Sequence, residues 1–306
     1  GSFEDIRPCI VCCRCLDDSF TGRKGLSCSV NPAVGREGEI FPLTKIKKVM
    51  VIGAGPAGLQ ASLAARERGH NVSLVERGNS IGGQLNLASL PPYKSDVAKL
   101  IKFYKRQLEK SDIKVSLDIE ATPDMIAKAN IESVIVATGS YPLIPDLPGV
   151  KNEGVLSALD IISGKKETGD SIIIVGGGMI GCETAEMLAG KGKKVIVLEM
   201  LDRIASDVGP SNRWVLLMRL KKAGVRLESR ARVIEIMERE VRVQRDRGVE
   251  VFVGDTIVIA VGMRPENNLA GKLRGLVSDV NVIGDAGSPR RIKEAVEEGY
   301  LTGMRL

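Results

Sequence analysis

The strongest constraint on the fold is a glycine-rich motif that occurs twice in the chain. Each copy has the pattern G-x-G-x-x-G, follows an apolar run typical of a buried strand and precedes a helical pattern. The apolar runs are residues 49–52 and 172–175. The glycines of the two copies are Gly53, Gly55, Gly58, Gly176, Gly178 and Gly181. One such motif is weak support for a binding site, but two copies in this context predict two Rossmann-like units.

An acidic residue stands at the same place in both copies. Glu76 lies 23 residues after Gly53, and Glu199 lies 23 residues after Gly176. In a Rossmann unit the glycines allow a tight turn and close approach of a pyrophosphate to the helix N-terminus, and the acid binds ribose hydroxyls. An acid there also repels a 2′-phosphate, so Glu199 favours NADH over NADPH if the second site holds a nicotinamide nucleotide. One copy could instead be a relic of the fold that holds no ligand.

The bulk properties limit the class of protein. A chain of 306 residues with 43% hydrophobic content suits about two domains. Aromatic residues make up only 3%, which argues against nucleic-acid stacking platforms, and the net charge of +6 is dispersed. The sequence shows no membrane-spanning run and no signal peptide, so we expect a cytoplasmic protein without nucleic-acid or membrane partners. The single histidine, His70, lies in a predicted turn, which argues against histidine-based catalysis and histidine-ligated zinc.

The order of the patterns predicts the domain organisation. We expect an α/β protein with two Rossmann-like three-layer nucleotide-binding domains, the second inserted in the first, preceded by a small cysteine-rich segment. Within the second domain, alternating residues predict a β-meander at 232–239, 240–245 and 249–253. The expected divisions are the cysteine-rich segment at 1–44, a discontinuous nucleotide-binding domain at 45–150 and 271–306, and an inserted nucleotide-binding domain at 151–270.

Five of the six cysteines lie in the first 44 residues. Four of them, Cys9, Cys12, Cys15 and Cys28, have the spacing C-x2-C-x2-C-x12-C. A run of three cysteines plus a distant fourth is typical of a 4Fe-4S cluster, whereas zinc, the main rival, usually takes two C-x2-C pairs. Cys13 is either an alternative ligand or a non-ligating neighbour. Cys182 is expected to pack as a small buried residue.

With these residues assembled, the chain resembles the C-terminal part of the iron-sulfur flavoenzymes that include 2,4-dienoyl-CoA reductase and trimethylamine dehydrogenase. These enzymes form the multidomain branch of the Old yellow enzyme family, and the resemblance covers nearly the whole chain. The family usually has Gly where Val11 stands and Asn where Cys13 stands. The markers that carry the resemblance are Arg7-Pro8-Cys9-Ile10, Asn31-Pro32, the two glycine motifs, Ile81-Gly82-Gly83-Gln84, Ala137-Thr138-Gly139, Glu183 and Gly284-Asp285 before Pro289-Arg290.

The resemblance implies FAD at the first motif, or only ADP as in the amine dehydrogenases, and NAD(P)H at the second. The residues it implies for the first nucleotide are Gly53, Gly55, Gly58, Glu76, Arg77, Gln84, Ala137, Thr138, Gly139, Gly284 and Asp285. Those it implies for NAD(P)H are Gly176, Gly178, Gly181, Glu183 and Glu199. The implied cluster ligands are Cys9, Cys12, Cys15 and Cys28.

These enzymes also carry an N-terminal FMN-binding α/β barrel where the substrate reacts, and nothing in this sequence corresponds to it. The resemblance therefore implies an electron-input module. NADH would reduce FAD, and the 4Fe-4S cluster would pass electrons to FMN on the barrel, which would reduce an enoyl or enone C=C bond. The residues that catalyse that reduction would lie on the barrel, and a homo-oligomer is left open.

Two alternatives belong to other functional classes. The nucleotide domains could form a non-catalytic scaffold that holds ADP, as in an amine-dehydrogenase-type module. Gln84 and Asp285 favour FAD, because an ADP scaffold has no need of contacts to the ribityl chain. A disulfide reductase of the thioredoxin reductase type fits poorly, because it needs a redox C-x-x-C near the flavin and the second domain offers only Cys182.

Overall fold

The computed structural model describes residues 3–22, 25–42 and 45–306. It contains two compact units, each built on a parallel five-stranded sheet, which confirms the predicted α/β class. The first unit comprises Gly1–Ser89, Lys94–Tyr141 and Arg264–Leu306, and the second comprises Leu90–Tyr93 and Pro142–Met263. Residues 1–2, 23–24 and 43–44 of the predicted iron-sulfur segment lie outside the described residues.

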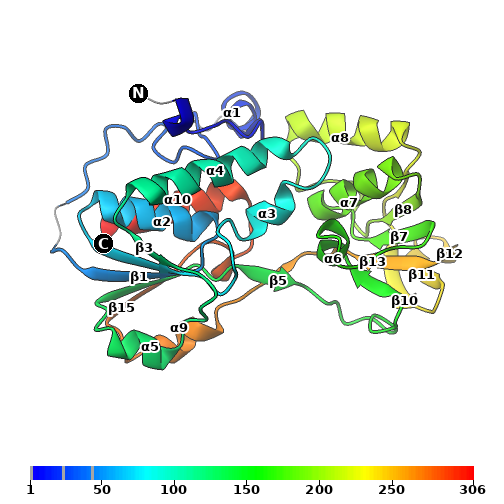
Figure 1. Ribbon diagram of the computed structural model, residues 1–306. Helices are drawn as coiled ribbons and strands as arrows, with labels where there is room; N and C mark the ends of the chain where they lie inside the picture. The colour runs from blue at the N-terminus through cyan, green and yellow to red at the C-terminus, as the bar shows by residue number, and fades with distance from the viewer. Residues whose placement is uncertain (1–2, 23–24, 43–44) are drawn as a thin grey trace. The chain divides into compact units, whose positions relative to one another are not determined.

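The first unit is a three-layer sandwich (Figure 1). Its strands, in the order β15-β4-β1-β2-β3, are β15 (Asp279–Val282), β4 (Ser133–Val136), β1 (Lys48–Ile52), β2 (Asn71–Val75) and β3 (Lys114–Ser116). The helices on one face of the sheet are α2 (Pro56–Glu67), α4 (Ser95–Lys110) and α10 (Ile292–Arg305). Those on the other face are α5 (Pro123–Lys128) and α9 (Asn268–Leu273).

The apolar run before the first motif, residues 49–52, forms the buried part of strand β1. Val49 and Val51 pack into the core beneath α2 and α4, while Met50 and Ile52 pack into the core on the opposite face. A central parallel strand is covered by helices on both faces, so every position favours an apolar residue.

Short elements complete the first unit. They are a 3-10 helix at Phe3–Asp5, α1 (Arg14–Leu16), a π-helical turn at Asp17–Thr21, α3 (Gln84–Ala88) and a 3-10 turn at Gly284–Ala286. Two further strands, β5 (Ser140–Pro142) and β14 (Met263–Pro265), pair where the chain passes between the units.

The second unit repeats the parallel architecture and adds an antiparallel sheet. Its parallel strands, in the order β6-β13-β7-β8-β9, are β6 (Val155–Ser157), β13 (Thr256–Ile259), β7 (Ser171–Val175), β8 (Lys194–Leu198) and β9 (Arg226–Glu228). Its helices are α6 (Ala158–Ile162), α7 (Met179–Gly190) and α8 (Pro210–Lys222). The predicted meander is confirmed as β10 (Arg232–Ile236), β11 (Glu240–Arg245) and β12 (Gly248–Val253).

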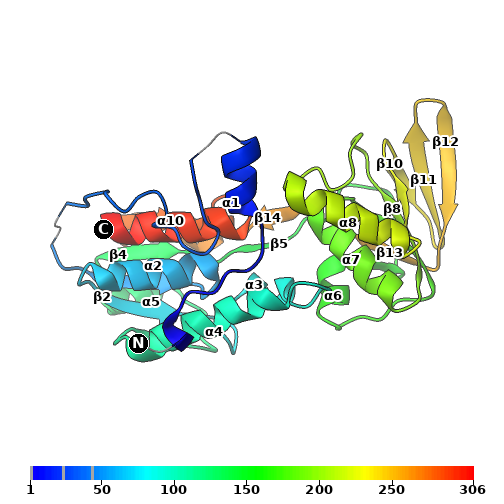
Figure 2. The same cartoon turned by 90° about the horizontal axis from the view of Figure 1, so that it is seen from above.

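Helices α2 and α10 lie side by side over the first sheet, as Figures 1 and 2 show, and small residues allow their close approach. A Cβ atom added to Gly299 would lie 2.3 Å from the carbonyl oxygen of Ala57. One added to Gly303 would lie 2.7 Å from the carbonyl oxygen of Ala61. Because the obstacle at both places is backbone, a larger residue would force the two helices apart.

The substitution Gly299→Ala should therefore lower the free energy of unfolding by about 1–3 kcal/mol, the usual range for overpacking. Gly271→Ala in α9 is the matched control, because a Cβ there meets nothing within 4 Å. That change should raise stability by about 0.5–1 kcal/mol, as expected for alanine in a helix. Urea unfolding of the two variants measures the difference, and equal stabilities would contradict this account of the helix contact.

His70 lies in the turn before β2, but the sequence did not reveal its burial. Its side chain is fully buried, and its Nδ1 accepts a 3.1 Å hydrogen bond from the backbone N–H of Lys47. Burial lowers the pKa of His70, and the positive charges of Lys47 and Arg68 act in the same direction. The ring is therefore neutral in the folded protein.

Stability should fall as the pH drops below about 6.5, the pKa of an unfolded histidine. The unfolded chain takes up a proton there and the folded chain resists it, so the contribution of His70 is complete above that pH and is lost below it. His70→Asn keeps an acceptor near the Nδ1 position and removes the titration, so its stability should change less between pH 6.5 and 5. Urea unfolding at several pH values checks this, and parallel profiles for both proteins would contradict it.

Candidate functional site

The first glycine motif forms the turn between β1 and α2. Gly53 has a φ of +103°, and an added Cβ would lie 2.3 Å from the carbonyl oxygen of Ala137, just after β4. A Cβ on Gly58 would lie 1.9 Å from the carbonyl oxygen of Gly53. The fold itself therefore requires glycine at both positions.

Gly55 is different, because the fold places no demand on it. Its φ of −75° suits any residue, and an added Cβ would meet nothing within 4 Å. It is the N-cap residue of α2 and, as a glycine, gives the helix no side-chain cap of its own. A helix N-terminus beside open space suits a pyrophosphate. The space beside Gly55, the start of α2 and Glu76 is called the first cleft below.

The carboxylate of Glu76 is hydrogen-bonded to the backbone of the first glycine motif. Its Oε2 accepts a 2.7 Å hydrogen bond from the N–H of Ala54, and its Oε1 accepts one of 2.7 Å from the N–H of Gly78. A carboxylate has about four acceptor positions, so Glu76 retains capacity for ribose hydroxyls. The neighbouring Arg77 is exposed.

A polar cluster joins three residues that are far apart in the sequence. The amide nitrogen of Gln84 donates to the hydroxyl of Ser140 at 2.9 Å and to its carbonyl at 3.2 Å. The hydroxyl of Ser140 in turn donates to Oδ2 of Asp285 at 3.1 Å. Sequence reasoning predicted Gln84 and Asp285 but missed Ser140, although it directly follows Ala137-Thr138-Gly139.

The side chain of Asp285 is partly buried. Burial raises the pKa of its carboxyl, while the hydrogen bonds from Ser140 and from the backbone N–H of Arg290, the latter 3.0 Å long, oppose the shift. Next to it, the N–H of Gly284 donates to Glu298 at 2.7 Å. Thr138, two residues after the end of β4, donates its hydroxyl to the carbonyl of Glu266. The cluster offers donors and acceptors for a ligand rich in hydroxyl groups.

The second motif repeats the geometry of the first in the other unit. A Cβ on Gly176 would lie 2.3 Å from the carbonyl oxygen of Ala260, and one on Gly181 would lie 2.0 Å from that of Gly176. Glu199 accepts 2.7 Å and 2.8 Å hydrogen bonds from the N–H groups of Gly177 and Leu201. The two copies therefore build equivalent turns, with the acid bound to the motif in each.

The second motif, the start of α7 and Glu199 form the candidate site called the second cleft below. Two residues near the start of α7 are buried. Glu183 is buried near the start of the helix. Cys182 is fully buried, as predicted, and burial followed by the charge of Asp207 raises the pKa of its thiol to about 12. Cys182 is therefore a packed thiol and not a reactive thiolate.

The N-terminal cysteines lie along a turn with unusual backbone conformations. Val11 and Cys13 both have left-handed φ values, +52° and +56°. The N–H of Val11 points to the sulfur of Cys9 at 3.4 Å, an arrangement that suits a thiolate. Burial, and then the neighbouring Cys12, raises the pKa of Cys13. No group of three or more Cys, His, Asp or Glu side chains within residues 3–22, 25–42 and 45–306 is placed to hold a metal ion.

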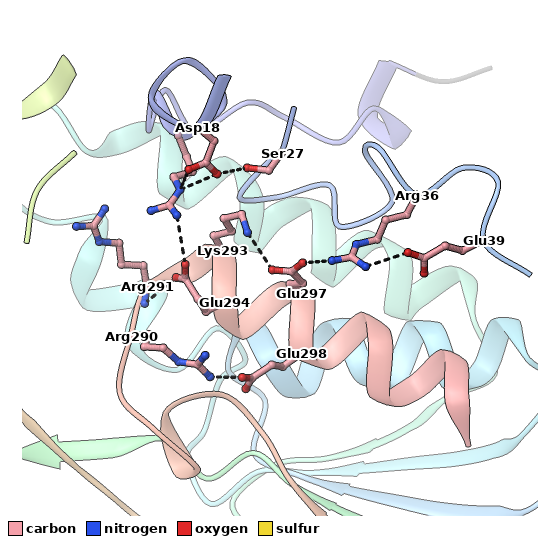
Figure 3. A network of polar contacts seen from close by, with 11 residues as sticks. Asp18, Ser27, Arg36, Glu39, Arg290, Arg291, Lys293, Glu294, Glu297 and Glu298 are labelled. Carbon is pink, nitrogen blue, oxygen red and sulfur yellow. Dashed lines mark hydrogen bonds and ion pairs between the residues drawn. The ribbon is translucent and has the colours of Figure 1, made fainter. Parts of the chain in front are cut away.

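An ion-pair network attaches this segment to α10 (Figure 3). Arg14 pairs with Asp18 at 2.9 Å and approaches Glu294 on the helix at 3.9 Å. Further along, Arg36 pairs with Glu297, which also binds Lys293 at 2.9 Å. The cysteine segment is therefore held against the helix that follows Gly284-Asp285.

Comparison with known proteins identifies the family. The profile described as pyridine nucleotide-disulphide oxidoreductase matches residues 47–299. The chain belongs to this family. In agreement with the two clefts, it is an oxidoreductase chain with an FAD- and NAD(P)H-binding fold.

Individual relatives are longer than this chain. It is 36% identical to a metal reductase of Desulforamulus reducens, matching 100% of this chain and 51% of that protein. It is 36% identical to an NADH oxidase of Thermoanaerobacter brockii, over 100% of this chain and 48% of that protein. The solved structure of a 2-naphthoyl-CoA reductase superposes with a TM-score of 0.93 and 34% identity, over 99% of this chain and 47% of that one. The chain thus spans about half the length of these relatives.

Residues 3–22, 25–42 and 45–306 contain no helix with the length and apolar character needed to cross a bilayer.

The contrast between Gly55 and Gly58 separates nucleotide binding from folding. Gly55→Ala should leave the melting temperature of the nucleotide-free protein unchanged but remove most bound FAD, because the new methyl group fills space beside the helix N-terminus. Gly58→Ala should destabilise the fold itself, since its Cβ meets backbone at 1.9 Å. The flavin-to-protein absorbance ratio and thermal melting measure both effects. Full FAD content in Gly55→Ala would contradict the placement of the nucleotide.

Proposed function

We propose that this chain is the NADH-oxidising, electron-input part of a larger iron-sulfur flavoenzyme. Support comes from two glycine motifs that form equivalent turns in one chain and from relatives about twice as long. When bound, FAD supplies two-electron acceptance from NADH and release of single electrons. The residues of this chain bind and orient the two nucleotides.

We assign FAD to the first cleft and NADH to the second. In the first, Gly55 and the start of α2 would hold the pyrophosphate, Glu76 the adenosine ribose, and the cluster of Gln84, Ser140 and Asp285 the ribityl chain. This cluster favours FAD over ADP, because ADP has no ribityl group to engage it. The other residues proposed for the first cleft are Gly53, Gly58, Arg77, Ala137, Thr138, Gly139 and Gly284.

In the second cleft, Gly178 and the start of α7 would hold the pyrophosphate, and Glu199 the adenosine ribose. Gly176 and Gly181 shape the turn, and Glu183 would lie toward the nicotinamide. The carboxylate of Glu199 repels a 2′-phosphate, so we assign NADH and not NADPH as the preferred donor.

A 4Fe-4S cluster is proposed at Cys9, Cys12, Cys15 and Cys28. The support is the spacing of these cysteines and the N–H of Val11 directed at the sulfur of Cys9. The four sulfurs do not form a metal-binding group in the structure, so cluster binding would require these side chains to move together.

The partner of this module would be an FMN-binding barrel in the same full-length protein. One relative, 32% identical over 97% of this chain, is a cinnamate reductase of Clostridium sporogenes. Together with the naphthoyl-CoA reductase, it supports reduction of an activated C=C bond as the reaction of the whole enzyme. Disulfide reduction, which the family name suggests, is disfavoured because the one cysteine of the second unit is the buried Cys182.

The test is anaerobic addition of NADH to the purified protein, followed at the visible absorbance maximum of the flavin. NADH should bleach the flavin, and NADPH should do so only at higher concentration because of Glu199. Bound, intact FAD that neither nucleotide reduces would overturn the dehydrogenase proposal.

Analysis of the bound groups in the same sample tests the cofactors. The proposal expects FAD together with about four iron and four sulfide ions per chain. ADP released on denaturation would instead support the scaffold alternative. About one zinc ion per chain in place of the iron would mean that the cysteines hold a structural zinc site and not a cluster.

A further inference from the structure

The loops that follow the two acids return to their motifs in the same way. Six residues after Glu76, the N–H of Gly82 donates to the carbonyl of Ala54 at 2.8 Å. Six residues after Glu199, the N–H of Ala205 donates to the carbonyl of Gly177 at 2.6 Å. Gly82 and Ala205 both have positive φ values, +109° and +52°. The two loops can therefore be compared position by position.

The copies differ at the eighth residue after the acid, which is Gln84 in the first and Asp207 in the second. The amide of Gln84 is neutral and donates to Ser140. The carboxylate of Asp207 accepts from the N–H of Met179, the first residue of α7, with oxygen distances of 2.9 Å and 3.1 Å.

The space around the glycine that precedes each helix differs between the two copies as well. A Cβ on Gly55 meets nothing within 4 Å, whereas one on Gly178 would lie 3.3 Å from a carboxylate oxygen of Asp207. The space that is open beside the first helix N-terminus is thus occupied by an internal anion beside the second.

Asp207 accepts from the first N–H of α7, that of Met179, at the end of the helix where a pyrophosphate would bind. The N-terminus of a helix stabilises negative charge, and two anions at one N-terminus repel each other. A nucleotide entering the second cleft must therefore displace this carboxylate or tolerate its repulsion. The first copy has no such carboxylate, because Gln84 is uncharged, and Pro56, which stands where Met179 does, has no N–H to bind one.

We propose that Asp207 weakens nucleotide binding in the second cleft by competing with the pyrophosphate for the N-terminus of α7, which keeps NADH exchangeable. The inference rests on the proposed function, in which NADH must enter and leave in each turnover while FAD stays bound. The eighth position would then distinguish a substrate site from a prosthetic-group site.

Two substitutions test the competition. Asp207→Gln gives the second copy the residue of the first, and Asp207→Asn removes the charge while keeping the size and an acceptor oxygen. The probe is ADP-ribose, which carries the pyrophosphate and the adenosine ribose but cannot reduce FAD. Calorimetry on FAD-loaded protein at low salt should show dissociation constants about three- to thirtyfold lower in both variants. The gain should shrink at high salt.

The matched control is Asp202→Asn, which removes a carboxylate from the same exposed loop and leaves the contact between Asp207 and Met179 in place. Its affinity should equal that of the wild type. Unchanged FAD content and near-wild-type melting of Asp207→Asn show that the fold is intact, even if Asp207→Gln folds poorly.

The outcomes separate the two proposals. If the wild type binds ADP-ribose and the variants bind it no tighter, or more weakly, Asp207 is only a helix cap and the inference is wrong. If neither the wild type nor Asp207→Asn binds ADP-ribose, the second cleft is not a nucleotide site, and the proposed function falls together with the inference.

Discussion

Both clefts depend on one close contact, between the turn that follows a strand and the carbonyl that follows the neighbouring strand. Gly53 faces Ala137 in this way and Gly176 faces Ala260, each so closely that a Cβ would lie 2.3 Å from the oxygen. The contact sets the turn so that the next helix begins at the carboxyl edge of the sheet. The acid at the end of the adjacent strand then reaches the turn and binds its backbone.

Two residues of the cysteine segment have backbone conformations that their side chains disfavour. Val11 and Cys13 stand where the iron-sulfur flavoenzymes that the sequence resembles usually have Gly and Asn, and both adopt left-handed backbone conformations. Gly and Asn tolerate that region, whereas a β-branched valine does so only with strain. Contacts around the turn must hold it, and those in the structure include the burial of Ile10 in the core and ion pairs from Arg14 and Arg36 to α10 (Figure 3).

Two copies of one architecture need not perform one task. The first has open space beside Gly55 at the start of α2 and a polar cluster that extends from Gln84 to Asp285, which under the proposed function would hold a cofactor that stays bound. The second has a carboxylate on the helix N-terminus and a buried, unreactive thiol beneath it. The residues at the start of the two helices differ in ways that bear on anion binding, since the first copy has Pro56 and Gln84 where the second has Met179 and Asp207.

The sequence by itself determined the two Rossmann-like units, because strand patterns, glycine turns and the acid 23 residues later are short-range features of one βαβ segment. It also indicated Gln84 and Asp285, but not Ser140, which joins them only because the carboxyl ends of β4 and β15 meet at one edge of the sheet. The burial of His70 and the contact of Asp207 with α7 were decided in the same way. Each depends on segments distant along the chain whose approach is set by packing of the whole unit, and local patterns carry no information about such approaches.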